Sequence, residues 1–142
     1  MQVRFFVKED GTLDTDAIKG GVYHVELLKE NKDKRISLYV GESTHVAARC
    51  GKHIYKVFED ASYFGLEKED LIDDSLILRF RVLESINESK PKMSLKNPYK
   101  DSEINHIRDH KPLTQLSTSD RQKKKDKRIK AVQDKMIEYK FK

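Results

Sequence analysis

The chain has 142 residues, with 29 lysines and arginines against 24 aspartates and glutamates, so its formal net charge is +5. This length suits one domain, and the 12 phenylalanines and tyrosines can anchor one modest core, which argues against a disordered chain. No apolar run is long enough for a signal peptide or a spanning helix, and the one cysteine allows no internal disulfide. We therefore expect a cytoplasmic protein without membrane contact.

The first nineteen residues are predicted to be an N-terminal extension that contains one short strand. Gln2–Val7 is rich in β-branched and aromatic residues, and the turn sequence Glu9-Asp10-Gly11 follows it. We expect the main domain to cover residues 20–116 and a basic helix to cover residues 117–142.

A hairpin is predicted after Gly20-Gly21. Two segments with strand character, Val22–Leu28 and Ile36–Val40, are separated by a polar run that suits a hairpin tip. Because side chains alternate along strands, Tyr23 and Tyr39 should project from the same face if the register permits.

The next segment, residues 43–58, has the periodicity of a helix. Its apolar residues recur at intervals of three and four: Val46, Cys50, Ile54 and Val57. Ser43 or Thr44 is predicted to be the N-cap. Arg49 and His53 are four residues apart and should share the flank beside the apolar stripe.

A short acidic helix around Glu67–Ile72 and a third strand over Leu76–Leu83 are predicted next. The strand alternates, with Arg79 and Arg81 opposite its apolar residues. The two X-Pro steps in Asn87–Lys100 indicate a loop. A helix capped by Asp101 or Ser102 should then run to about His110, before Pro112.

The C-terminal segment carries the basic charge. Arg121–Lys142 contains ten basic and three acidic residues, a net of +7, which leaves 19 basic and 21 acidic residues elsewhere. A helix should begin near Ser119, with Ser119-Asp120-Arg121-Gln122 as its capping box. Its apolar residues, spaced by three and four, are Ile129, Val132, Met136 and Tyr139. The candidate nucleic-acid contacts are Lys123, Lys124, Lys125, Lys127, Arg128 and Lys130.

Three interpretations of this helix follow from the sequence. As an electrostatic grip on phosphates it could be removed after Thr118 without loss of the fold. Alternatively, its apolar residues form a layer of the core or pair with a partner helix, and its lysines are a solvated face.

One helix face also carries three potential metal ligands, Glu103, His106 and His110. A single helix rarely encloses a metal, and the His-Glu-x-x-His pattern of zinc hydrolases is absent, so surface or phosphate-contacting histidines are the preferred interpretation. Cys50 lies in the apolar stripe and is interpreted as a buried structural residue.

The order of several motifs is more informative than any one of them. Gly21-Val22-Tyr23, Tyr39-Val40-Gly41 and Arg49, ten residues beyond Tyr39, together resemble the GIY-YIG nuclease superfamily. His53 matches a histidine found in several branches of that family. Downstream, Glu103, Pro112 and Gln115 fall where the family has its metal-binding Glu, a Pro and an Asn.

Two departures from the family pattern are present. Fifteen residues separate Tyr23 and Tyr39, a longer gap than is usual, although the excess lies in the polar turn where an insertion costs little. Gln115 replaces the usual Asn and keeps the carboxamide, so a structural hydrogen bond could survive with a different reach.

The resemblance implies an α/β (α+β) fold with a small three-stranded, mostly antiparallel sheet flanked by helices. It also implies an endonuclease that hydrolyses DNA with one Mg²⁺ or Mn²⁺ held by Glu103. Tyr23 would be the general base or would orient the attacking water, and it could act as a base at neutral pH only if neighbouring cations such as Arg49 favour its phenolate. Arg49 would bind the scissile phosphate, Tyr39 would hydrogen-bond the water or phosphate, and His53 would assist proton transfer or bind the phosphate.

Gly21, Gly41 and Gln115 would support this site structurally. The alternative function is a non-catalytic nucleic-acid-binding module with the same fold. The expected partner is DNA, with RNA left open, and the expected state is a monomer or a weak homodimer.

Overall fold

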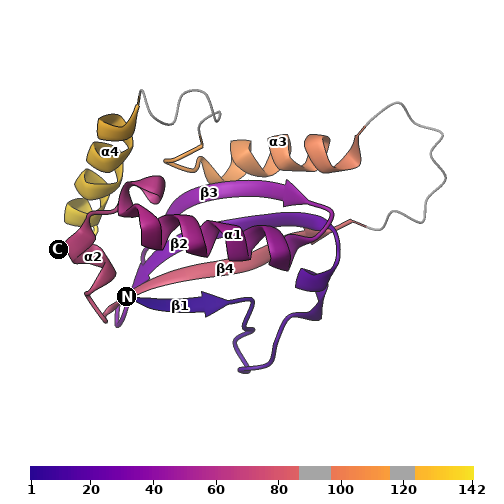
Figure 1. Ribbon diagram of the computed structural model, residues 1–142, viewed down its shortest axis with the longest axis horizontal. Helices are drawn as coiled ribbons and strands as arrows, with labels where there is room; N and C mark the ends of the chain where they lie inside the picture. The colour runs from indigo at the N-terminus through magenta and orange to yellow at the C-terminus, as the bar shows by residue number, and fades with distance from the viewer. Residues whose placement is uncertain (87–96, 116–123) are drawn as a thin grey trace.

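Residues 1–86, 97–115 and 124–142 are described by a computed structural model, in which the sheet is built around the predicted hairpin (Figure 1). β2 (Gly21–Lys29) pairs antiparallel with β3 (Arg35–Ser43), so the polar run between them forms the hairpin tip as predicted. Both strands extend beyond their predicted limits, because they begin or end in polar residues that hydrophobic alternation does not mark.

The sheet has four strands, so the prediction of three was wrong. β4 (Leu76–Ser85) pairs antiparallel with β2, and β1 (Gln2–Phe5) pairs parallel with β4, giving the order β1-β4-β2-β3. The rings of Phe5 and Phe80 lie 5.6 Å apart across the last pair. Pairing with β1 satisfies backbone groups along an edge of β4 that would otherwise be open. The two strands are distant in the chain, so no local pattern predicts this contact.

The predicted helix after the hairpin is α1 (Val46–Glu59), and its buried residues are Val46, Cys50, His53 and Val57. His53 is thus part of the packed face, and Ile54 is only partly buried. The predicted caps were wrong: His45 is the N-cap, without a side-chain hydrogen bond, while Ser43 is the last residue of β3. Ser43 and Thr44 precede the N-cap because β3 extends to Ser43 and the chain bends before α1 begins at Val46.

The remaining described elements are η1 (Thr15–Ile18), η2 (Ala61–Phe64), α2 (Lys68–Leu71), α3 (Pro98–His110) and α4 (Lys125–Glu138). α2 lies within the predicted acidic helix. α3 begins earlier than predicted, because the Asn97 side chain accepts hydrogen bonds from the first turn and Pro98 occupies its first position. The rest of the predicted loop, residues 87–96, lies outside the described residues. None of the described helices is long and apolar enough to cross a membrane.

Helices cover both faces of the sheet. Tyr23 contacts His53 of α1, whereas the adjacent residue His24 lies against His110 of α3, with 4.4 Å between the ring centres. Because neighbouring side chains on a strand point to opposite faces, α1 and α3 lie on opposite sides of β2. Figure 1 shows α1 crossing in front of the sheet and α3 running along β3.

α4 is a layer of the core, as one of the three interpretations of its apolar residues expects. Val132 and Met136 are fully buried, and Phe141 just beyond the helix is 1% exposed. α4 packs against η2, whose C-cap Gly65 has φ 71°, and a Cβ on that glycine would overlap Val132. The predicted capping box, residues 119–122, lies outside the described residues.

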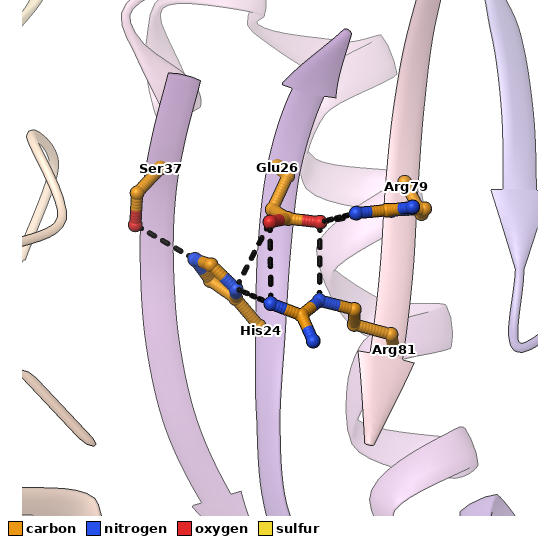
Figure 2. Close-up of polar contacts among 5 residues, drawn as sticks. All are labelled: His24, Glu26, Ser37, Arg79 and Arg81. Carbon is orange, nitrogen blue, oxygen red and sulfur yellow. Dashed lines mark hydrogen bonds and ion pairs between the residues drawn. The ribbon is translucent and has the colours of Figure 1, made fainter. Parts of the chain in front are cut away.

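A buried polar cluster lies on the α3 side of the sheet (Figure 2). His24 and Glu26 are 1% and 3% exposed. His24 Nε2 is 2.7 Å from Ser37 Oγ, and Glu26 accepts hydrogen bonds from the Nε atoms of Arg79 and Arg81 at 2.8 and 3.2 Å. Burial lowers the pKa of His24 to about 3 against the opposing effect of Glu26, so the imidazole is neutral. Burial disfavours ionised Glu26, but hydrogen bonds and charge from Arg79 and Arg81 outweigh it, so the pKa of Glu26 is lowered.

We expect stability to fall as the pH drops below about 6.5. In the unfolded chain His24 takes up a proton near its ordinary pKa of ~6.5, whereas in the fold it does so only near 3. Between these values the unfolded state binds more protons, so the free energy of unfolding decreases with falling pH. Urea denaturation at pH 7.5 and 5 measures this decrease.

The control for this experiment is an exposed histidine. His24→Gln should reduce the difference in stability between pH 7.5 and 5, whereas His45→Gln should leave it unchanged, because His45 is exposed. The same pH dependence in wild type and His24→Gln would contradict the assignment.

Candidate functional site

The two predicted tyrosines share one face of the hairpin. In the β2–β3 ladder Tyr23 is opposite Gly41, and the rings of Tyr23 and Tyr39 are 6.2 Å apart. Tyr23 is 1% exposed and Tyr39 is partly buried, so the second phenol lies nearer the surface. The register therefore confirms the prediction that these side chains lie together.

α1 and η2 complete a chain of hydrogen-bonding side chains behind these rings. The Tyr23 hydroxyl is 2.7 Å from His53 Nε2, and His53 Nδ1 is 2.8 Å from the Tyr63 hydroxyl. His53 is 2% exposed, and its ring also packs against Tyr39. Sequence analysis missed Tyr63, because it lies in a short 3₁₀ helix without a periodic signal.

Arg49 lies at the exposed edge of the same group, beside Tyr23. Burial, followed by Tyr39 and Cys50, raises the pKa of Tyr23 well above its ordinary value, although the neighbouring Arg49 opposes this shift. The phenol is therefore protonated at neutral pH, so the condition under which a phenolate base was expected is not met.

Glu103 belongs to a second, separate group. Lys100 Nζ lies 3.2 Å from Glu42 Oε1 and 3.6 Å from Glu103 Oε1, so one ammonium contacts two carboxylates. Burial and then the charge of Glu42 raise the pKa of Glu103, although Lys100 opposes this shift. Sequence analysis missed Glu42, even though it directly follows the predicted Tyr39-Val40-Gly41 motif.

The two groups lie near one end of the β2–β3 pair. Glu42 is opposite Val22 in the ladder, one step from the Tyr23–Gly41 pair. Among the described residues, no hydrogen bond or ion pair joins Glu103 to Tyr23, Arg49 or His53. The structure thus brings Tyr23, Tyr39 and His53 into contact and places Arg49 beside Tyr23, whereas Glu103 lies in the second group.

The three predicted support residues have definite structural roles. Gln115 Oε1 accepts a hydrogen bond of 2.9 Å from the Val40 backbone N–H, so the carboxamide holds the outer side of β3. A Cβ on Gly21 would overlap the Glu84 carbonyl, and one on Gly41 would overlap the Tyr23 hydroxyl. Gly41 is therefore what allows the buried phenol to approach β3.

Gly41→Ala should lower the free energy of unfolding by about 1–3 kcal/mol, because the added methyl displaces the Tyr23 ring from His53. Urea denaturation measures the loss. Gly51→Ala is the matched control: it lies in α1 with open space around its Cα, so alanine should stabilise the helix by about 0.5–1 kcal/mol. Equal effects of the two substitutions would contradict close packing at Gly41.

The carboxylates of Glu42 and Glu103 are the groups best suited to hold a cation. No cluster of three or more histidines, cysteines or carboxylates placed for a metal occurs within residues 1–86, 97–115 and 124–142. A Mg²⁺ ion that keeps most of its waters needs only one or two carboxylates, so the pair fits such an ion. The other candidate metal ligands, His106 and His110 on the Glu103 face of α3, have separate partners. His106 contacts Glu84 at 3.2 Å, and His110 packs on His24.

The predicted basic residues of α4 differ in exposure. Lys127 and Lys130 are exposed, Lys124 and Lys125 are partly buried, and Arg128 is 5% exposed on the packed side of the helix. Burial leaves Arg128 little surface for a phosphate contact. Lys123 lies outside the described residues.

Comparisons with protein-family models, with curated proteins and with solved structures found no match to this chain.

Proposed function

We propose that this chain is a divalent-metal-dependent endonuclease that hydrolyses DNA phosphodiester bonds by GIY-YIG-type chemistry. The observation that carries the proposal is the contact group of Tyr23, Tyr39, Arg49 and His53. These residues come from three elements, and the motif order indicated the same four residues before any contact was known. A core packed only for stability does not require an exposed arginine beside a buried phenol.

Arg49 and Tyr39 are the residues placed to meet the substrate. Arg49 is exposed, and its planar guanidinium can bind two phosphate oxygens from its position beside Tyr23. Its fixed charge would offset the negative charge that grows on the phosphoryl oxygens during attack by water. The partly buried Tyr39 can donate its O–H to the phosphate or accept from the water.

Tyr23 acts in this proposal as a neutral proton carrier. In the proposed tautomer, His53 Nδ1–H donates to Tyr63, and Nε2 accepts the hydrogen bond of the Tyr23 hydroxyl. As water attacks phosphorus, Tyr23 takes the water proton and passes its own to His53, so no phenolate is required beforehand. The departing oxygen is protonated by solvent. This relay explains why a raised pKa of Tyr23 is compatible with its role.

Glu103, together with Glu42, would hold the metal ion. When bound, Mg²⁺ or Mn²⁺ would neutralise phosphate charge and stabilise the departing oxygen. The raised pKa of Glu103 fits a pair of carboxylates that one ammonium, Lys100, does not fully neutralise.

The test is incubation of purified protein with supercoiled plasmid in Mg²⁺ or Mn²⁺, with EDTA as the control. Conversion to nicked and linear DNA, abolished by EDTA, supports the proposal. DNA binding without cleavage under any metal would overturn the endonuclease and leave the non-catalytic module. Absence of both activities would reject both functions.

A further inference from the structure

The α3 side of the sheet carries an arginine pair that is separate from the candidate site. Figure 2 shows Glu26 between His24 and the guanidinium groups of Arg79 and Arg81. Arg79 donates from both Nε and Nη2 to Glu26 Oε2, and Arg81 Nη2 lies 3.2 Å from His24 Nδ1. Glu26 is 3% exposed, so it contacts both guanidinium groups from the buried side of the cluster.

This arrangement leaves donors for a ligand. A guanidinium has five N–H donors, and Glu26 and His24 engage only Nε and Nη2 of each arginine. Within the described part of the chain, Nη1 of Arg79 and Nη1 of Arg81 make no hydrogen bond and can donate to a ligand. One buried carboxylate also cannot neutralise two guanidinium groups, so the pair keeps a net positive charge.

A pocket of about 300 Å³ lies over these arginines. Its basic lining residues are Lys8, Arg35, Arg79 and Arg81, and its acidic ones are Glu9 and Asp14. α3 packs mainly against β2 and β3, and the Arg79 and Arg81 side chains on β4 are 20% and 36% exposed. The Asp14 carboxylate is already engaged as the N-cap of η1.

Arg35 is the most informative residue of the pocket. It is exposed at the start of β3, and its side chain has no hydrogen bond or ion pair with any residue of the described ranges. An exposed arginine with no partner among the described residues, beside two arginines oriented by a buried carboxylate, makes a convergent set of anion donors.

We propose that this pocket binds a phosphate group through Arg35, Arg79 and Arg81. The fork of each guanidinium matches two phosphate oxygens, and the Glu26 carboxylate restricts the motion of two of the three forks, so less side-chain entropy is lost on binding. The phosphate can belong to a nucleic-acid backbone or to a small phosphorylated molecule. The site lies on the sheet face opposite Tyr23, and the inference does not depend on the proposed nuclease activity.

The test titrates inorganic phosphate into the full chain at constant ionic strength, with the arginine side-chain resonances followed by ¹⁵N NMR. We expect saturable shifts at Arg79 and Arg81 in the wild type. Arg35→Gln should weaken phosphate binding about tenfold, the loss of a charge-assisted hydrogen bond. Because its side chain has no partner in the described fold, the substitution should leave the thermal midpoint unchanged.

Lys68→Gln is the matched control, since it removes one exposed positive charge from α2, away from the pocket lining. It should leave phosphate affinity within twofold of the wild type. Arg79→Lys provides a second variant that keeps the charge but loses the fork, and it should also weaken binding. Shifts that chloride reproduces, or equal affinities in Arg35→Gln and Lys68→Gln, would overturn the proposal.

The same variants identify the source of the phosphate. If it is a nucleic-acid backbone, Arg35→Gln should weaken binding to a short DNA duplex and reduce the slope of log affinity against log salt by about one. If it is a small molecule, DNA binding should match that of Lys68→Gln while phosphate binding is still reduced. Neither readout measures cleavage, so failure of the nuclease proposal would be seen separately.

Discussion

Arg49→Ala and Glu103→Ala should each lower the rate of DNA cleavage by at least about a hundredfold while most of the DNA affinity is retained. Arg49 is the exposed cation beside Tyr23, and Glu103 is the partly buried carboxylate whose pKa is raised. In the proposed mechanism both act on charge that develops during attack, so their loss affects turnover more than binding. Single-turnover cleavage and duplex binding, measured separately, check this.

Matched variants make the comparison specific. Arg108→Ala and Glu69→Ala remove the same charges from exposed positions on α3 and α2 and should cleave at the wild-type rate. Arg49→Lys keeps the charge but not the bidentate fork, and should remain strongly impaired. Turnover near normal in either alanine variant of the site would reject the assignment of that residue.

A chain that ends at Thr118 should fail to fold. Such a truncation removes Val132, Met136 and Phe141, which are at most 1% exposed, and it uncovers the side of η2 against which α4 packs. Burial of three such side chains contributes about 5–9 kcal/mol, which is comparable with the whole stability of a small domain. Circular dichroism during heating should show no cooperative transition.

This outcome separates the structural and electrostatic roles of α4. Lys127→Gln with Lys130→Gln alters only exposed side chains, so this variant should fold normally and show a flatter salt dependence of DNA binding. A truncated chain with the same thermal midpoint as the full chain would show that α4 is dispensable. An unchanged salt dependence of DNA binding in the lysine variant would show that these two lysines of α4 do not contact DNA.

Local patterns predicted most of the secondary structure but not how the elements end. Alternation located the hairpin and β4, and helical spacing located α1 and the packed side of α4. The caps were less predictable, because Ser43 is taken up by β3 while Asn97, in a segment interpreted as loop, caps α3. Several residues near a helix end can serve as a cap, and the path of the preceding chain selects among them.

The candidate site likewise contains residues that the sequence indicated and one that it did not. The resemblance to a nuclease family indicated Tyr23, Tyr39, Arg49 and His53, and strand alternation predicted that the two tyrosines share a face, as they do. It missed Tyr63, whose contact with His53 depends on how the chain turns after α1. Such contacts join elements whose mutual placement no local period describes.

What periodicity alone determines here is which face each side chain takes, because a strand repeats every two residues and a helix about every 3.6. Tertiary structure decided the consequences of that placement. β1 joins the sheet through pairing with a distant strand, and Tyr23 stays protonated because the residues packed around it disfavour its phenolate. Glu26 orients two arginines because its buried carboxylate accepts hydrogen bonds from both of them. Burial and long-range pairing are properties of the whole fold, so they follow from packing and not from local pattern.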